Sequence, residues 1–113
     1  MTDKERKYLS DILSSIRLVY SFTENINSFD EYSTSYMVKS AVERQLGIIG
    51  EAVNLFIKNS DDSPPLNNAK QIISLRNRLV HSYDNIDDRI IWNIIRRHLS
   101  PLEDEVVQLL SEA

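Results

Sequence analysis

The chain contains very few residues that interrupt a helix. Of its 113 residues only Gly47 and Gly50 are glycines, and the three prolines are Pro64, Pro65 and Pro101. Glycine and proline mark the turns of β-rich folds and are disfavoured inside helices. A chain of this length fits one domain, residues 1–113. We therefore predict an all-α fold in a single domain.

Apolar residues recur at intervals of three and four, which is typical of helices that bury one face. This spacing predicts helices over about 3–26, 33–58 and 68–81, and a fourth that begins near 88. We expect Asp87 or Asp88 to cap the fourth helix, which then bends or restarts at a new cap, Ser100, followed by Pro101. Residues 25–32 and 59–68 are predicted connections. The expected architecture is an up-and-down bundle of four to five helices.

The second predicted helix contains both glycines, and each costs ~1 kcal/mol relative to alanine. A close contact with another helix would compensate for that cost. The face of this helix that is predicted to be buried comprises Met37, Ala41, Leu46, Ile49, Val53, Phe56 and Ile57.

The composition excludes several kinds of site. The absence of cysteine rules out disulfides and thiolate chemistry and fits a reducing cytoplasm. No apolar run reaches the ~18 residues of a membrane span, and the N-terminus lacks a signal-peptide core. His81 and His98 match no metal-ligand spacing, and two glycines cannot form a phosphate-binding loop. We expect a cytoplasmic protein without a metal or cofactor.

Charge is distributed unevenly over a chain whose formal net charge is −4. Residues 24–62 carry seven acids and three bases, whereas residues 70–98 carry six bases and three acids. The negative net charge of the whole chain argues against a nucleic-acid coat protein. A locally basic surface would suit brief contact with a polyanion, and a solvated face of mixed charge fits equally well.

The third predicted helix carries the residues best suited to chemistry. On an ideal helix Asn77 and His81 share a face, whereas Arg76 lies about 140° away from His81. For Arg76 and His81 to meet one substrate, the helix must end near His81 or two subunits must share the site. A structural role is also open, in which Arg76 pairs with a core acid such as Glu51. For His98 we expect a structural role at a helix C-terminus.

The segment Arg76-Asn77-Arg78-Leu79-Val80-His81-Ser82-Tyr83 resembles the Arg-x4-His-x-Tyr signature of HepT-type proteins in the HEPN superfamily. Ile48-Ile49-Gly50-Glu51-Ala52 and Trp92-Asn93-Ile94-Ile95 resemble flanking stretches of that family. The likeness therefore spans nearly the whole chain. Ser82 stands where a glycine is common, and this departure concerns only the local turn.

The resemblance implies a HEPN-like homodimer whose motif helices face each other across a cleft. It implies a metal-independent RNA endonuclease that acts as a toxin, with Arg76 and His81 catalytic and Asn77 and Arg78 supporting them. The partner it implies is a minimal nucleotidyltransferase (MNT) antitoxin, which silences the toxin by transferring AMP from ATP to Tyr83.

Two other functions remain open. The chain could be a catalytically silent helical partner, or substrate-binding subunit, of a minimal nucleotidyltransferase. It could also be a dimeric helical scaffold without nucleotide chemistry. The toxin and the silent partner differ in whether Arg76 and His81 line an open cleft or are buried in structural pairs.

Overall fold

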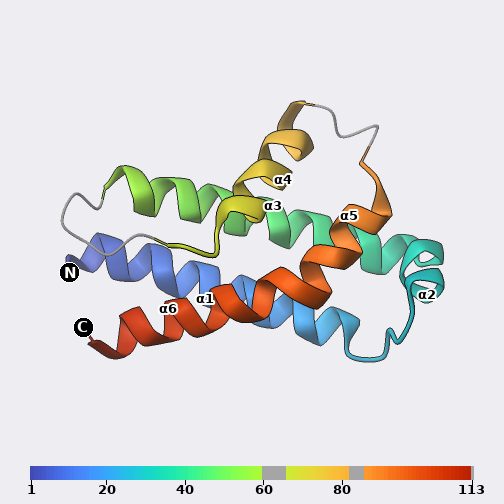
Figure 1. Cartoon of the computed structure of the whole chain (residues 1–113), viewed down its shortest axis with the longest axis horizontal. Helices are drawn as coiled ribbons and strands as arrows, with labels where there is room; N and C mark the ends of the chain where they lie inside the picture. Colours follow the sequence, from blue (N-terminus) through green and yellow to red (C-terminus); the bar gives the residue numbers. More distant parts are fainter. Residues whose placement is uncertain (60–65, 82–85, 113) are drawn as a thin grey trace.

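The computed structural model describes residues 1–59, 66–81 and 86–112, except for the side chains of Val80 and His81. Its helices are α1 (Asp3–Thr23), α2 (Phe29–Thr34), α3 (Tyr36–Lys58), α4 (Lys70–His81), α5 (Asp88–Asn93) and α6 (Leu99–Glu112), with a π-helical segment (Ile94–His98) joining α5 to α6. No strand occurs within these ranges. The predicted all-α fold is therefore confirmed (Figure 1). α5, the π-helical segment and α6 follow one another without a break, so the described residues form five helices.

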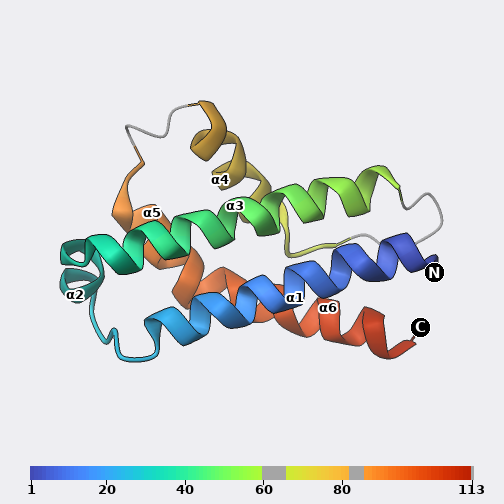
Figure 2. The same cartoon turned by 180° about the vertical axis from the view of Figure 1, so that it is seen from behind.

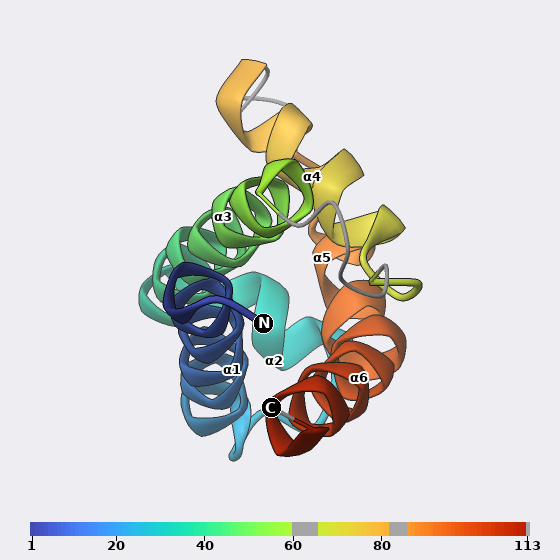
Figure 3. The same ribbon diagram turned by 90° about the vertical axis from the view of Figure 1, so that its left-hand side faces the viewer.

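The three longest helical stretches run along the long axis of the molecule. α1 lies against α3 and α6, and both of these helices run antiparallel to it (Figures 1 and 2). α4 packs on α3 and stands out from the bundle, whereas α2 closes one end (Figure 3). The motif helix therefore lies at the edge of the bundle.

The core follows from the three-and-four spacing of apolar residues. Burial of a large aliphatic side chain contributes roughly 1.5–3 kcal/mol, so one apolar stripe per helix suffices to hold the bundle. The fully buried side chains of α1 and α3 are Leu9, Ile12, Ile16, Val19, Val42, Leu46, Ile49 and Val53. α4 and α6 add further buried side chains to the same core, namely Ile72, Leu75, Leu99, Leu102 and Val106.

Part of the predicted buried face of α3 is wrong. Met37 is 80% exposed and Ile57 is 48% exposed. Counting back from buried Val42 in steps of three or four gives residue 38 or 39, so position 37 falls outside the stripe. Leu46, Ile49, Val53 and Phe56 are buried as predicted, and Ala41 is half-buried.

The predicted connection over 25–32 is also wrong in part, because α2 forms at its end. The hydroxyl of Ser28 caps this helix by accepting a hydrogen bond from the Glu31 N–H at 3.2 Å. Tyr32 is fully buried and stacks on Trp92, with ring centroids 5.6 Å apart. A helix of six residues is too short to show a repeat of apolar residues in the sequence. The contact of Tyr32 with Trp92, far along the chain, holds it in place.

The predicted restart at Ser100 does not occur. The helix continues through Ser100, and a π-helical turn, in which the Leu99 N–H donates to Ile94 O, precedes Pro101. A proline removes a donor and crowds the carbonyl four residues back, and a π turn is one way for a helix to absorb such a disturbance. His98 is therefore not at a helix C-terminus, and its Nε2 lies 3.4 Å from Asn93 Nδ2.

Asp87, one of the two residues predicted as the cap of this helix, is the N-cap of α5. Its carboxylate accepts a hydrogen bond from the Arg89 N–H at 2.9 Å. In the described part of the chain no helix is long and apolar enough to cross a membrane.

Candidate active site on helix α4

Helix α4 approaches α3 closely at Gly50. A Cβ added at Gly50 would overlap Arg76 Cβ, and it would lie 2.6 Å from Arg76 Cγ and 3.6 Å from Ile72 O. The stem of Arg76 therefore occupies the space that a side chain would fill. The predicted close contact is confirmed at Gly50 and is wrong for Gly47, where an added Cβ would meet nothing within 4 Å.

The guanidinium of Arg76 is held by Glu51, the residue that follows this glycine. Arg76 Nη2 donates to Glu51 Oε2 at 2.7 Å, and Nη1 donates to Asn77 Oδ1 at 3.5 Å. The Arg76 side chain is 28% exposed and the Glu51 side chain is 52% exposed. The expected pairing with Glu51 is thus present, but the pair lies at the surface and not in the core.

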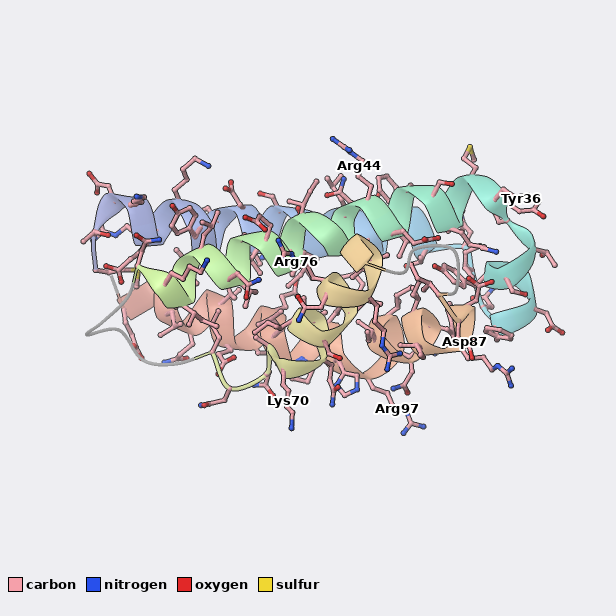
Figure 4. All side chains as sticks on the ribbon, turned by 90° about the horizontal axis from the view of Figure 1, so that it is seen from above. Tyr36, Arg44, Lys70, Arg76, Asp87 and Arg97 are labelled. Carbon is pink, nitrogen blue, oxygen red and sulfur yellow. The ribbon has the colours of Figure 1, made fainter. Side chains whose placement is uncertain are left out.

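Arg76 retains donors for a further ligand. A guanidinium carries several N–H donors in a rigid fork that matches phosphate geometry. Figure 4 shows Arg76 lying against α3, where Glu51 fixes its orientation. This arrangement presents a preoriented cation at the edge of the bundle, and it can bind an anionic oxygen in addition to Glu51.

Asn77 and Arg78 are both exposed. Successive residues are about 100° apart around a helix, so Arg78 lies nearly opposite Arg76 on α4. Arg78 lines a different cavity, of about 340 Å³, together with Arg89 and Asn93 of α5. The structure thus places Asn77 beside Arg76 but separates Arg78 from both the Arg76–Glu51 pair and its surroundings.

His81 is the last residue of α4, and its side chain lies outside the described part of the structure, as does all of Tyr83. The backbone is helical from Arg76 to His81, so these two positions lie about 140° apart around the α4 axis. The catalytic role predicted for His81 and the modification predicted at Tyr83 remain predictions.

A cavity of about 600 Å³ opens beside Glu51, between α1, α3 and the end of α4. Gly47, Glu51 and Leu79 contribute to its lining, and so does Glu43. Burial raises the pKa of the Glu43 carboxyl, and the nearby Asp88 carboxylate raises it further. The lining thus combines apolar residues with charges of both signs, since Lys7 and Arg44 also contribute to it, and Glu51 links the cavity to the guanidinium of Arg76.

A second ion pair ties α3 to α5. Lys39 Nζ lies 2.9 Å from Asp88 Oδ2, and both side chains are mostly buried, at 19% and 24% exposure. The hydrogen bond to Asp88 raises the pKa of Lys39. This pair is structural in position, because it holds the start of α5 against the start of α3. Among the described residues no three acidic or histidine side chains are grouped to hold a metal.

Sequence reasoning missed the surroundings of Trp92, which it used only as a mark of the family. Trp92 is half-buried against Tyr32, and the guanidinium carbon of Arg96 lies 5.4 Å from its ring centroid. The available signal was the placement of three arginines, Arg89, Arg96 and Arg97, around the single tryptophan of the chain.

Known proteins of the same kind match nearly the whole chain. A protein of Methanocaldococcus jannaschii named "Putative RNase" is 34% identical over 89% of this chain and 92% of its own length. Another "Putative RNase", from Caldanaerobacter subterraneus, is 31% identical over 95% of each chain. A Thermococcus cleftensis protein named "Probable ribonuclease HepT" is 28% identical over 96% of this chain and 98% of its own.

A comparison with solved structures finds no match. The family model described as "Ribonuclease HepT-like" matches residues 12–109, a span that includes the whole of α4. The chain therefore belongs to the HepT-like ribonuclease family.

Proposed function

We propose that this chain is an RNA endonuclease that cleaves without a metal ion. The observation that carries the proposal is the position of Arg76 on α4, where Glu51 holds its guanidinium at the surface. The ribonuclease names of relatives that align over most of their length support the same activity.

The proposed reaction is an attack by the 2′-hydroxyl of the RNA on its adjacent phosphorus. The bond to the 5′-oxygen of the next nucleotide breaks, and the products are a 2′,3′-cyclic phosphate and a 5′-hydroxyl. His81 accepts the proton of the 2′-hydroxyl, and the imidazolium so formed returns a proton to the leaving 5′-oxygen. Imidazole titrates near pH 6.5, so His81 suits both roles, each worth roughly 10²–10⁴ in rate.

Arg76 is the proposed stabiliser of the charge that develops on the phosphate. A prepositioned donor of this kind contributes roughly 10²–10³ in rate. Glu51 orients the guanidinium, and Asn77, which accepts a hydrogen bond from Arg76, can turn its amide N–H groups toward a phosphate oxygen. Arg78 supports the site from the other side of α4 as a further binding residue for RNA.

The proposed active unit is a homodimer. Within one protomer the positions of Arg76 and His81 lie about 140° apart around α4, so on a regular helix their side chains point in different directions. A two-fold axis that sets two α4 helices face to face supplies Arg76 from one subunit and His81 from the other.

We further propose that the chain acts as a toxin under the control of a minimal nucleotidyltransferase antitoxin. Transfer of AMP to Tyr83 would place bulk and negative charge two residues from His81 and so exclude RNA phosphate. The absence of cysteine suits action in a reducing cytoplasm. A Tyr83→Phe variant should keep RNA cleavage and escape silencing by the antitoxin, and a silenced variant would refute this control.

A second candidate is a catalytically silent partner of the nucleotidyltransferase. The 2.7 Å pair between Arg76 and Glu51 favours it, because a guanidinium that is engaged by a carboxylate has less charge to offer a phosphate. The exposure of this pair favours the enzyme, because an exposed ion pair adds little to stability and leaves the guanidinium accessible to a phosphate.

The test uses chimeric oligonucleotides in a buffer that contains EDTA. A DNA strand with one ribonucleotide should be cut only after that nucleotide and leave a 2′,3′-cyclic phosphate, whereas an all-deoxy strand should remain intact. Cleavage of the all-deoxy strand, or cleavage that EDTA abolishes, would refute the mechanism. The silent-partner function predicts no cleavage of either strand.

A further inference from the structure

A groove runs from α4 along α5 to the π-helical segment, on the side of α4 that carries Arg78. Two neighbouring cavities, of about 340 Å³ and about 680 Å³, form it, and both are lined by Arg89 and Asn93. We call this surface the arginine groove and define it by Arg78, Arg89, Trp92, Asn93, Arg96 and Arg97. It joins the motif helix to a surface that the proposed chemistry does not use.

The arginines of the arginine groove are exposed, and within the described residues few acidic side chains pair with them. Across residues 1–59, 66–81 and 86–112, no ion pair engages Arg78, Arg96 or Arg97. Arg89 makes one, with Asp87 at 3.5 Å, and both side chains are exposed, so solvent screens it. Figure 4 shows Arg97 and Lys70 projecting from the same side of the molecule, whereas Arg44 projects from the opposite side.

An aromatic platform lies among these cations. Tyr32 is fully buried and stacks under Trp92 with an interplanar angle of 28°, which fixes the orientation of the indole. Arg96 lies 5.4 Å from the ring centroid, and Phe29 lines the same cavity. A fixed, partly exposed aromatic ring beside unpaired arginines is the arrangement that binds single-stranded nucleic acid, with bases stacked on rings and phosphates on cations.

We propose that the arginine groove binds a single-stranded segment of the RNA substrate next to the segment that is cut. The inference rests on the proposed ribonuclease function and names a second binding surface for its substrate. Arg78 connects this surface to α4, and Trp92 of α5 offers the ring on which a base stacks. An acidic protein would use the arginines but not the aromatic platform, so RNA is the occupant that accounts for both.

The binding test uses the full chain with His81→Ala, so that RNA stays intact, and a fluorescent 12-nucleotide oligouridine. The pair of substitutions Arg96→Gln and Arg97→Gln is compared with Lys4→Gln and Arg17→Gln, which remove the same charge from α1. Binding to the groove variant should weaken by about tenfold, and the slope of log affinity against log salt should become shallower by about 1.4, roughly 0.7 for each lost phosphate contact. The α1 variant should stay within about twofold of the parent.

Trp92 provides an independent readout, because it is the only tryptophan in the chain. RNA should quench its fluorescence. Trp92→Leu should weaken binding by at least about fivefold, whereas Trp92→Phe, which keeps an aromatic face, should restore most of it. The melting temperature of each variant shows whether weaker binding comes from loss of the aromatic ring or from loss of the folded structure.

Equal RNA binding by the groove and α1 variants, or unchanged Trp92 fluorescence on addition of RNA, would refute RNA binding by the arginine groove. Neither result would contradict RNA cleavage by the wild type. Polyglutamate that competes as well as RNA of equal charge would also overturn it, in favour of an acidic protein partner. If RNA binds as predicted but wild-type protein does not cleave it, the proposed ribonuclease function fails and the groove stands as an RNA-binding surface.

Discussion

Single residues decide how closely the motif helix can approach α3. Gly50 leaves room for the stem of Arg76, and the next residue, Glu51, then receives the guanidinium. One residue thus sets the spacing of two helices and its neighbour sets the direction of a charge. This part of the site was open to prediction from the sequence, because glycine within a helix suggested a close contact and Glu51 was a candidate partner for Arg76.

Alanine substitutions at the two glycines should have opposite effects. Gly47→Ala should raise the free energy of unfolding by up to about 1 kcal/mol, since alanine favours the helix and the space is open. Gly50→Ala should lower it by about 1–3 kcal/mol, because the new methyl group overlaps the Arg76 stem. Urea denaturation measures both, and equal effects at the two positions would contradict the close contact.

Glu43 should make stability depend on pH. Burial raises its pKa in the folded protein above the ordinary value of 4.5, so protonated Glu43 favours folding. This contribution is fully present below the unfolded pKa and is lost as pH rises through the folded pKa. Glu43→Gln should therefore raise the melting temperature at pH 7 and lose that advantage below about pH 4.

The control for this pH dependence is Asp104→Asn, at an exposed position of α6. It should have little effect on melting at either pH. A gain from Glu43→Gln that persisted at acidic pH, or that Asp104→Asn reproduced at neutral pH, would show that the charge of Glu43 is not its cause.

At the scale of helices, the sequence predicted those elements whose apolar stripe extends over several turns. α1, α3 and α4 have such stripes, and their positions were predicted to within a few residues. α2 and the π-helical turn were not predicted. The first depends on the stacking of Tyr32 with Trp92, and the second on how a continuous helix accommodates Pro101.

The position of the site on α4 was predictable from the motif, but its surroundings were not. Which side of α4 faces α3 depends on the crossing of the two helices, and that crossing brings Arg76, and not Arg78, against Gly50. The arginine groove likewise depends on the packing of the π-helical segment against α4, which brings Arg78 and Arg89 to one cavity.

The N-cap of α5 should contribute measurably, because this helix begins the continuous stretch that carries Trp92. Asp87→Ala removes the acceptor for the Arg89 N–H and should lower the free energy of unfolding by about 1 kcal/mol. Asp87→Asn keeps an acceptor at the cap and should recover most of that loss. Chemical denaturation measures both variants, and an equal loss for alanine and asparagine would assign the effect to charge and not to capping.

At the scale of the whole molecule, the account requires two chains. Arg76→Ala and His81→Ala should each be inactive alone, but subunits mixed and allowed to exchange should regain activity. A mixed dimer retains one intact site, with Arg76 from one chain and His81 from the other. If half the dimers are mixed and each has one of two sites, about a quarter of wild-type activity returns.

This complementation discriminates between a shared site and a site within one chain. A protein with both residues of each site on the same chain would show no recovery after mixing. The molar mass in solution provides the accompanying check, since a dimer has twice the chain mass of 13.1 kDa.

The most direct test of the central claim is RNA cleavage in EDTA by the purified wild-type chain and by His81→Ala prepared in parallel. The account predicts that the wild type cuts RNA and that the variant is slower by roughly 10²–10⁴. Equal cleavage by the two proteins, or no cleavage by the wild type, would contradict it.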